Sequence, residues 1–310
     1  MKGLDWLKFF PFVYAPDVVR KATEVRGPYF SKPRPNKWIF GDVNFHFDAP
    51  WANPVFGFDG DARSVDAIKP GVRDILKIQY LERVYRSGPG PVDAWTKELF
   101  YENTWYFVGQ WFSGEKSLLI MRGILNTVQD GSKFRGLSLF HPRVFESAIA
   151  DYMDQSYGYQ RYGKRPDCRA PLDWEVLQLS KSIQGVKFDF HHIANGGKDN
   201  PELVRVVAFP VNSSQFVIIY FDMTALLLHD DITTKPTMAL CDSIIESMSL
   251  KVGKKTHSEW EKVKENCPDM SLSETMGEYQ WPLFEEKRSK KSKEKDITPA
   301  NDELRIEDRS

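Results

Sequence analysis

The chain has 310 residues, 41% hydrophobic and 14% aromatic, so it can bury a sizeable core in one large domain or two ordinary ones. Its formal net charge of −1 supplies no overall field that would favour nucleic acid or an anionic membrane surface. Three cysteines, Cys168, Cys241 and Cys267, form no CxxC pair, which argues against a disulfide framework and favours a reducing, cytoplasmic compartment.

An apolar cluster occupies residues 4–14. Asp5, Lys8 and Pro11 interrupt it, so it lacks the continuous apolar centre of a signal peptide. No later run reaches the ~20 apolar residues that a membrane-spanning helix requires, and we expect no transmembrane segment. We expect residues 4–14 to dock on the core. The alternative is a shallow membrane-surface anchor, which the aromatic and lysine side chains would suit.

The first hairpin is predicted over residues 37–48, with Gly41-Asp42 as a two-residue turn, because glycine supplies the positive φ that such turns need. A short helix is expected to end near Phe100, with Trp95 and Leu99 on one side. A second hairpin then pairs residues 103–112 with 118–128.

The positions of two prolines and the spacing of the apolar residues after them predict two helices. Pro142 begins one, because proline is preorganised for the first turn, and Gly158 ends it. Pro236 is expected to begin another, with a short strand at residues 249–252 after it. A capping box at Ser258 predicts one more short helix.

A third hairpin lies between these helices, at residues 202–223. In each of its two segments, apolar residues would lie on both faces of the strand. This is typical of strands that are covered on both faces. The sequence therefore predicts an α+β fold of mainly antiparallel sheet with helices packed on it. A hairpin followed by a helix occurs near 103–158 and again near 202–252, so two similar halves are possible without detectable residue identity.

The domain boundaries follow from this order. We expect an N-terminal half over residues 1–160 and a C-terminal half over 161–253, packed together as one compact unit. Residues 254–284 would hold a short helix and a docking segment. Residues 285–310 carry a lysine-rich run and little apolar surface, and we expect a disordered, charged tail.

The last quarter of this order, strands followed by a helix and the turn-back at residues 247–251, resembles the Mog1/PsbP-like α/β sandwich. The resemblance rests on the sequence of elements and on no residue motif. It implies such a sandwich in the C-terminal half as an alternative to the general α+β arrangement.

One polar cluster could carry chemistry: Asp189 and His191 in a predicted strand, with His229 and Asp231 further along. Imidazoles and carboxylates can bind a divalent metal or transfer a proton. No HExxH or comparable ligand spacing is present, and adjacent histidines in a strand face opposite ways. The simpler interpretation is a strand with one packed and one exposed histidine. We therefore name no cofactor and no metal site.

A second group of residues suits binding. Tyr157, Tyr159, Arg161 and Tyr162 place aromatic and basic side chains together, as protein interfaces and single-stranded nucleic-acid sites do. The balanced charge disfavours nucleic acid, and a solvated connector is the simpler interpretation. Trp281 and Phe284 end an apolar segment that could dock on the domain or bind a partner.

These observations favour a non-enzymatic binding protein, such as an inhibitor, immunity or accessory factor that contacts another protein. No catalytic motif was found, while tryptophan and tyrosine are abundant, with 9 and 12 residues. Two alternatives stay open. One is a metal-dependent hydrolase using the His/Asp cluster, and the other is a membrane-surface protein anchored by residues 4–14.

Overall fold

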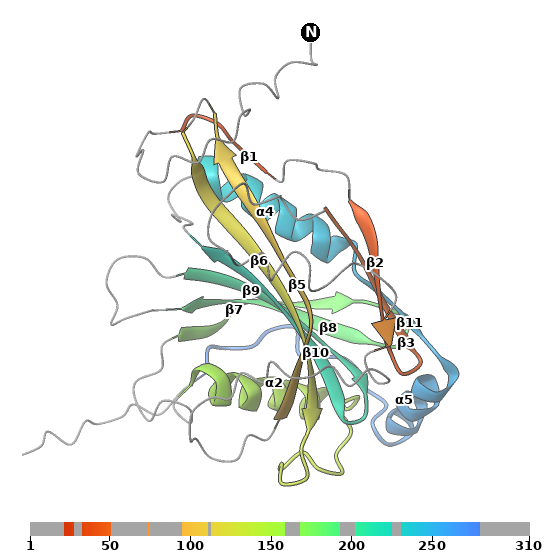
Figure 1. The fold of residues 1–310 in the computed structure, drawn as a ribbon. Coiled ribbons are helices and arrows are strands. Elements are labelled where there is room, and N and C mark those ends of the chain that lie inside the picture. The colour runs from red at the N-terminus through yellow and green to blue at the C-terminus, as the bar shows by residue number, and fades with distance from the viewer. Residues whose placement is uncertain are drawn as a thin grey trace, which may run out of the picture.

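The computed structural model describes residues 22–27, 33–50, 73–74, 95–110, 113–158, 168–192, 202–224 and 231–279. Within these ranges the chain forms two β-sheets with three helices packed on or beside them (Figure 1). The predicted α+β fold of mainly antiparallel strands is confirmed. The apolar cluster at residues 4–14 and the predicted tail at 285–310 lie outside the described residues.

The large sheet has seven strands in the order β1-β5-β6-β10-β9-β8-β7, and each neighbouring pair is antiparallel. Its strands are β1 (Val25–Arg26), β5 (Trp95–Gly109), β6 (Glu115–Val128), β10 (Gln215–Thr224), β9 (Glu202–Asn212), β8 (Gln184–His192) and β7 (Cys168–Gln178). The hairpin predicted near residue 210 forms β9 and β10, and β10 is the middle strand of the seven.

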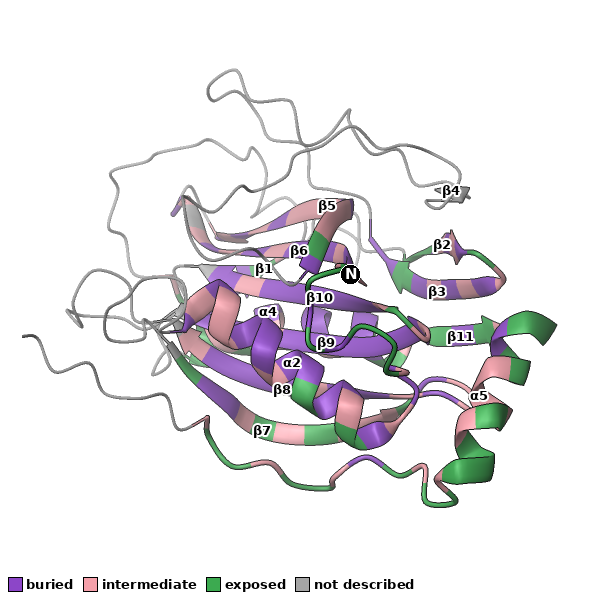
Figure 2. Ribbon diagram, turned by 90° about the horizontal axis from the view of Figure 1, so that it is seen from below, coloured by how far each residue is buried: buried purple, intermediate pink, exposed green. Residues whose placement is uncertain are grey.

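Two helices cover opposite faces of this sheet. Helix α2 (Pro142–Tyr157) contributes Phe145, Ile149 and other apolar side chains to one buried cluster, together with alternate residues of β8, β9 and β10. Helix α4 (Asp231–Glu246) joins a second cluster with the intervening residues of β9 and β10. The mostly purple colour of β9 and β10 in Figure 2 follows from this arrangement.

A small sheet completes the second cluster. It has the order β11-β3-β2-β4, with strands β11 (Ser249–Val252), β3 (Val43–Ala49), β2 (Arg34–Phe40) and β4 (Arg73–Asp74). Aromatic rings join the two sheets: the ring centroids of Phe45 and Phe209 lie 5.0 Å apart, and those of Phe47 and Tyr101 lie 5.1 Å apart. Gly41, with φ of 64°, forms the predicted β2–β3 turn.

Three predicted element boundaries were wrong. The helix expected up to Phe100 is the start of β5, because Trp95 and its neighbours pair with β6 from Val128 onward. Helix α4 begins at Asp231, and Pro236 lies inside it. At Trp95, pairing with a distant strand outweighs the local pattern.

The third error concerns helix α5 (Lys254–Asn266), which begins before the predicted capping box at Ser258. The acceptor at its N-terminus comes from the β2–β3 turn. Asp42 accepts hydrogen bonds through Oδ2 from the backbone N–H of Lys255 at 2.9 Å and of Thr256 at 3.2 Å. These bonds satisfy helix donors that otherwise have no partner in the first turn.

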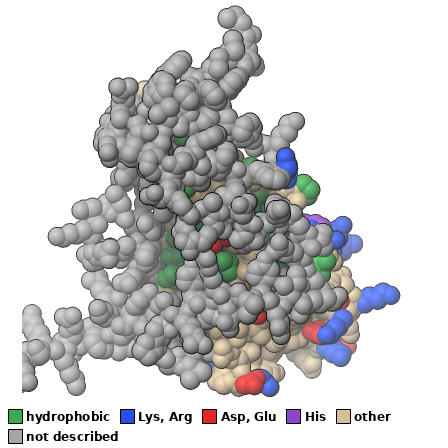
Figure 3. Space-filling view, in the orientation of Figure 1, with side chains coloured by type: hydrophobic (Ala, Val, Ile, Leu, Met, Phe, Trp, Pro, Cys, Tyr) green, Lys and Arg blue, Asp and Glu red, His purple; other side chains and the backbone are tan. Residues whose placement is uncertain are grey.

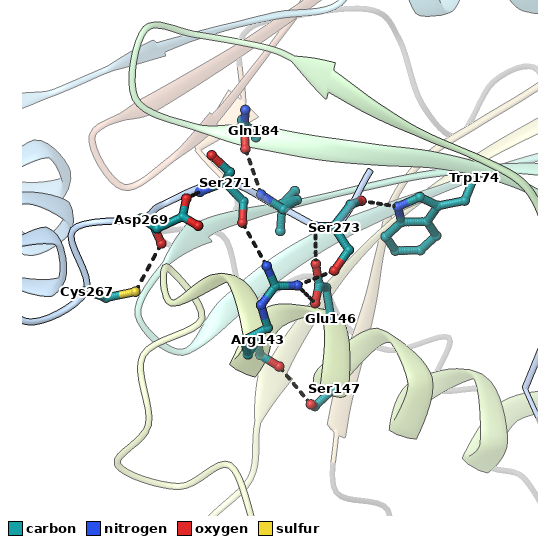
Figure 4. Close-up of polar contacts among 10 residues, drawn as sticks. Arg143, Glu146, Ser147, Trp174, Gln184, Cys267, Asp269, Ser271 and Ser273 are labelled. Carbon is teal, nitrogen blue, oxygen red and sulfur yellow. Dashed lines mark hydrogen bonds and ion pairs between the residues drawn. The ribbon is translucent and has the colours of Figure 1, made fainter. Parts of the chain in front are cut away.

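Residues 267–279 follow α5 as an extended segment, here called the C-terminal strap. Its Leu272 is buried in the cluster around α2. Figure 4 shows how polar contacts fix it there: the Ser273 N–H donates to Glu146 Oε1 at 2.6 Å, and Trp174 Nε1 donates to the Ser273 carbonyl at 2.8 Å. The strap ends where the Tyr279 N–H donates to the carbonyl of Ala170 in β7, at 2.7 Å.

Candidate functional site

An open groove of about 480 Å³ lies between α4 and the β7–β8 edge of the large sheet. Its apolar lining consists of five side chains that form the margin of the cluster under α4: Leu177, Leu179, Met238, Ile245 and Met248. The volume falls in the range typical of sites that accept a small molecule or a few side chains of a partner.

Charged side chains complete the lining: Glu175, Lys187, Arg205, Asp242 and Glu246. Each of the two cations is ion-paired. Lys187 Nζ lies 2.5 Å from Glu175 Oε2 across the β7–β8 pair, and Arg205 Nη1 lies 2.5 Å from Asp242 Oδ1 on α4. The groove therefore combines apolar side chains with two ion pairs and with Glu246, which no ion pair joins to another described residue.

Arg205 is further held from behind by Asp189 on β8. Its Nε donates to Asp189 Oδ1 at 2.8 Å, and its Nη2 donates to Oδ2 at 3.0 Å. Burial alone would lower the pKa of Arg205, but the hydrogen bonds and negative charge of Asp189 outweigh it and raise the pKa. The guanidinium is thus a permanent cation fixed in the inner wall of the groove.

Cys241 lies on α4 next to this cation but is fully buried. Burial raises the pKa of its thiol well above the ordinary value of 9.0, although the charge of Arg205 opposes the shift. A neutral, inaccessible thiol is a poor nucleophile. Cys241 therefore acts as a packing residue, as its place on the apolar side of the predicted helix indicated.

The predicted Asp/His cluster is only partly described. Asp189 is buried in its pair with Arg205, and Asp231, in the first turn of α4, pairs with Lys235 at 2.7 Å. His191 is partly exposed at the end of β8, opposite Arg169 in the register of β7 and β8. His229 lies outside the described residues. Among the residues that the structure does describe, no three His, Cys, Asp or Glu side chains converge as a metal site would need.

We compared the chain with known proteins. No protein-family model, no curated protein and no solved structure matches it. The resemblance to the Mog1/PsbP-like sandwich therefore stays a prediction from element order. In the described ranges, no helix is both long enough and apolar enough to cross a membrane.

The predicted aromatic binding residues are also only partly described. Tyr157, at the end of α2, packs on the core: its ring centroid lies 4.9 Å from that of Phe190 and 6.2 Å from that of Tyr220. Tyr159, Arg161 and Tyr162 lie outside the described ranges. Trp281 and Phe284 follow the last described residue, so their predicted docking role is neither supported nor opposed by any contact.

The face of the molecule drawn in Figure 3 carries both basic and acidic side chains where its residues are described. Basic and acidic side chains appear together at the right-hand margin, around α5. Helix α5 contains both lysine and glutamate residues, and Lys264 Nζ lies 5.0 Å from the centre of the Trp260 ring. This mixed surface agrees with the balanced charge of the whole chain.

Sequence reasoning missed the groove because its lining comes from four separate elements. One residue could have pointed to it. Arg205 interrupts the apolar strand β9, and a lone cation in a strand covered on both faces needs a buried acidic partner. That requirement would have linked Arg205 to Asp189, a candidate residue that lies directly behind the groove.

Proposed function

We propose that this chain is a non-enzymatic binding protein, of the inhibitor, immunity or accessory-factor kind, and that it contacts a partner protein through the groove beside α4. The observation that carries the proposal is the lining: five apolar side chains beside two ion pairs, Lys187–Glu175 and Arg205–Asp242. Such a surface gains free energy when apolar side chains of a partner displace water from it.

Two features of the lining favour a protein partner. Met238 is a flexible, partly exposed side chain that can adapt to differently shaped partner residues. Asp242, paired with the deeper Arg205, lies at the margin, where its charge can help to set the orientation of a partner. Arg205 and Asp189 are held in an ion pair and Cys241 is buried, so none of these three side chains is free for reaction chemistry.

The test is affinity capture with the full-length protein immobilised and native extract of its source cells as the sample. Met238→Glu places a charge in the groove, and Ala239→Glu places the same charge on the exposed side of α4 as a matched control. Circular dichroism and thermal unfolding first verify that both variants fold.

We expect one protein to be retained by the wild type and by Ala239→Glu, and to be lost at least about tenfold with Met238→Glu, since a buried unpaired charge is costly. Equal retention by both variants would contradict the proposal. So would turnover of a small substrate by the purified protein that Met238→Glu abolishes.

A further inference from the structure

The charges in and directly behind the groove are unequal in number. Four carboxylates face two cations, which leaves a net charge of −2: Glu175, Asp189, Asp242 and Glu246 against Lys187 and Arg205. The groove therefore attracts a positively charged ligand, although the whole chain is nearly neutral.

The cations and the carboxylates of the groove also lie at different depths. The side chains of Arg205 and Lys187 are only 11% and 20% exposed, whereas those of Asp242 and Glu175 are 45% and 55% exposed. Glu246 is exposed too, and no ion pair joins it to another described residue. An incoming ligand thus meets carboxylates at the rim and apolar side chains behind them. It should carry lysine or arginine next to apolar residues.

The chain itself contains a segment of this composition, directly after the C-terminal strap. Residues 281–284 are Trp, Pro, Leu and Phe, two glutamates follow at 285 and 286, and residues 287–295 contain six basic residues and one acidic residue. The basic residues therefore outnumber the acidic ones by six to three. We propose that residues 280–295, here called the basic segment, bind in the groove of the same chain. This inference rests on the proposed function of the groove, and it adds a competitor that would occupy the site when no partner is present.

The point of attachment makes this contact possible. The strap fixes Tyr279 beside Ala170 in β7, the strand that also supplies Glu175 and Leu177 to the groove. Seven residues of strand separate Ala170 from Leu177, a distance of about 23 Å. The eight residues from Tyr279 to Lys287 can span up to about 27 Å when extended. The basic residues can therefore reach the rim without any change in the strap.

Photo-crosslinking within the full-length chain tests the proposal. The reactive residue p-benzoylphenylalanine replaces Met238 in the groove, or Ala239 on the exposed side of α4 as the control. Mass spectrometry of the monomer band then identifies the crosslinked peptide. A mixture of isotope-labelled and unlabelled protein separates crosslinks within one chain from those between chains.

We expect position 238 to crosslink to residues 280–295 of the same chain at least about fivefold more than position 239. Glu246→Lys should reduce this yield, and so should raising the ionic strength from about 0.1 M to about 1 M, which shortens the Debye length from about 10 Å to about 3 Å. Equal yields from the two positions, or crosslinks from position 238 to another chain or only to other residues, would overturn the inference.

The two tests fail separately. If position 238 does not reach the basic segment but Met238→Glu still loses the captured partner, the inference is wrong and the proposed function stands. If the basic segment crosslinks from position 238 while both glutamate variants retain the partner, the groove holds the segment but is not the partner site. If the capture succeeds only after deletion of residues 280–310, the basic segment competes with the partner as proposed.

Discussion

Arg205 and Asp189 form a two-pronged ion pair between neighbouring strands of the large sheet, with donor–acceptor distances of 2.8 Å and 3.0 Å. Their side chains are only 11% and 6% exposed. Asp242 reaches the same guanidinium from α4, at 2.5 Å. The pair therefore links β8, β9 and α4 at one point, and the shape of the groove depends on it.

Removing one partner of this pair should be costly. Asp189→Leu leaves Arg205 largely buried with Asp242 as its remaining partner, and we expect a loss of about 2–4 kcal/mol of unfolding free energy. The double variant Asp189→Leu/Arg205→Met removes both charges and should recover most of that loss. Urea unfolding followed by tryptophan fluorescence measures both. A double variant as unstable as the single one would show that the pair is not the cause.

The cap of α5 should make stability depend on pH. Burial alone would raise the pKa of Asp42, but hydrogen bonds from Thr256 and Lys255 outweigh it and lower the pKa below the ordinary value of 3.8. A carboxyl group with a lowered pKa in the folded state stabilises the fold above that ordinary value. The contribution is lost as the pH falls through the folded pKa.

Asp42→Asn keeps an acceptor at the cap but cannot titrate. Its stability difference from the wild type should be constant at neutral pH and shrink below about pH 4, where the wild-type carboxyl begins to take up protons. A carboxyl titration by NMR checks the cause directly. Thr256→Val, which removes the Oγ1–H donor to Asp42, should move that titration toward the ordinary value. An unchanged titration in Thr256→Val would contradict the assignment.

Gly253 should not tolerate a side chain. A Cβ atom there would lie 2.4 Å from Oδ2 of Asp42 and 2.7 Å from its Cβ, which is closer than real Cβ contacts. We expect Gly253→Ala to cost about 1–3 kcal/mol, because Asp42 or the start of α5 must move. Gly277→Ala is the matched control, since its Cβ would meet nothing within 4 Å. Thermal unfolding of the two variants measures this cost. Equal unfolding midpoints would show that Gly253 does not lie this close to Asp42.

The two cysteines whose side chains are described should differ in reactivity. Cys241 is buried with a raised pKa, so an alkylating reagent at pH 8 should leave it unmodified in the folded protein. Cys267 is partly exposed and should react. Mass spectrometry of tryptic peptides before and after urea measures both. Modification of Cys241 at the rate of Cys267 without denaturant would show that α4 opens readily.

The sequence predicted the described hairpins and the helix from Pro142 because each depends on local chemistry. Gly41 supplies the turn conformation, Pro142 fixes the first turn of α2, and the apolar faces of β9 and β10 require cover on both sides. The same reasoning failed where the local structure depends on a residue that is distant in the sequence. Trp95 pairs with Val128, and the cap of α5 comes from Asp42, which no local pattern reveals.

The groove could not be predicted from the sequence for the same reason. Glu175, Lys187, Arg205 and Asp242 are spread over 68 positions of the chain, and only the pairing of β7, β8 and β9 and the placement of α4 bring them together. Asp189 was singled out as a candidate for acid–base chemistry. In the structure it forms an ion pair with Arg205, which it holds in place from behind the groove.

Strand β10 has a paired strand on each side and a helix or sheet over each face. Its amide protons can therefore exchange with deuterated solvent only when the molecule opens as a whole. Strand β7, at the margin beside the groove, has β8 as its one paired strand among the described residues. Exchange at Ile218 should thus report the global unfolding free energy, and exchange at Leu177 should report local opening. A ligand bound in the groove should slow exchange at Leu177 and leave exchange at Ile218 unchanged.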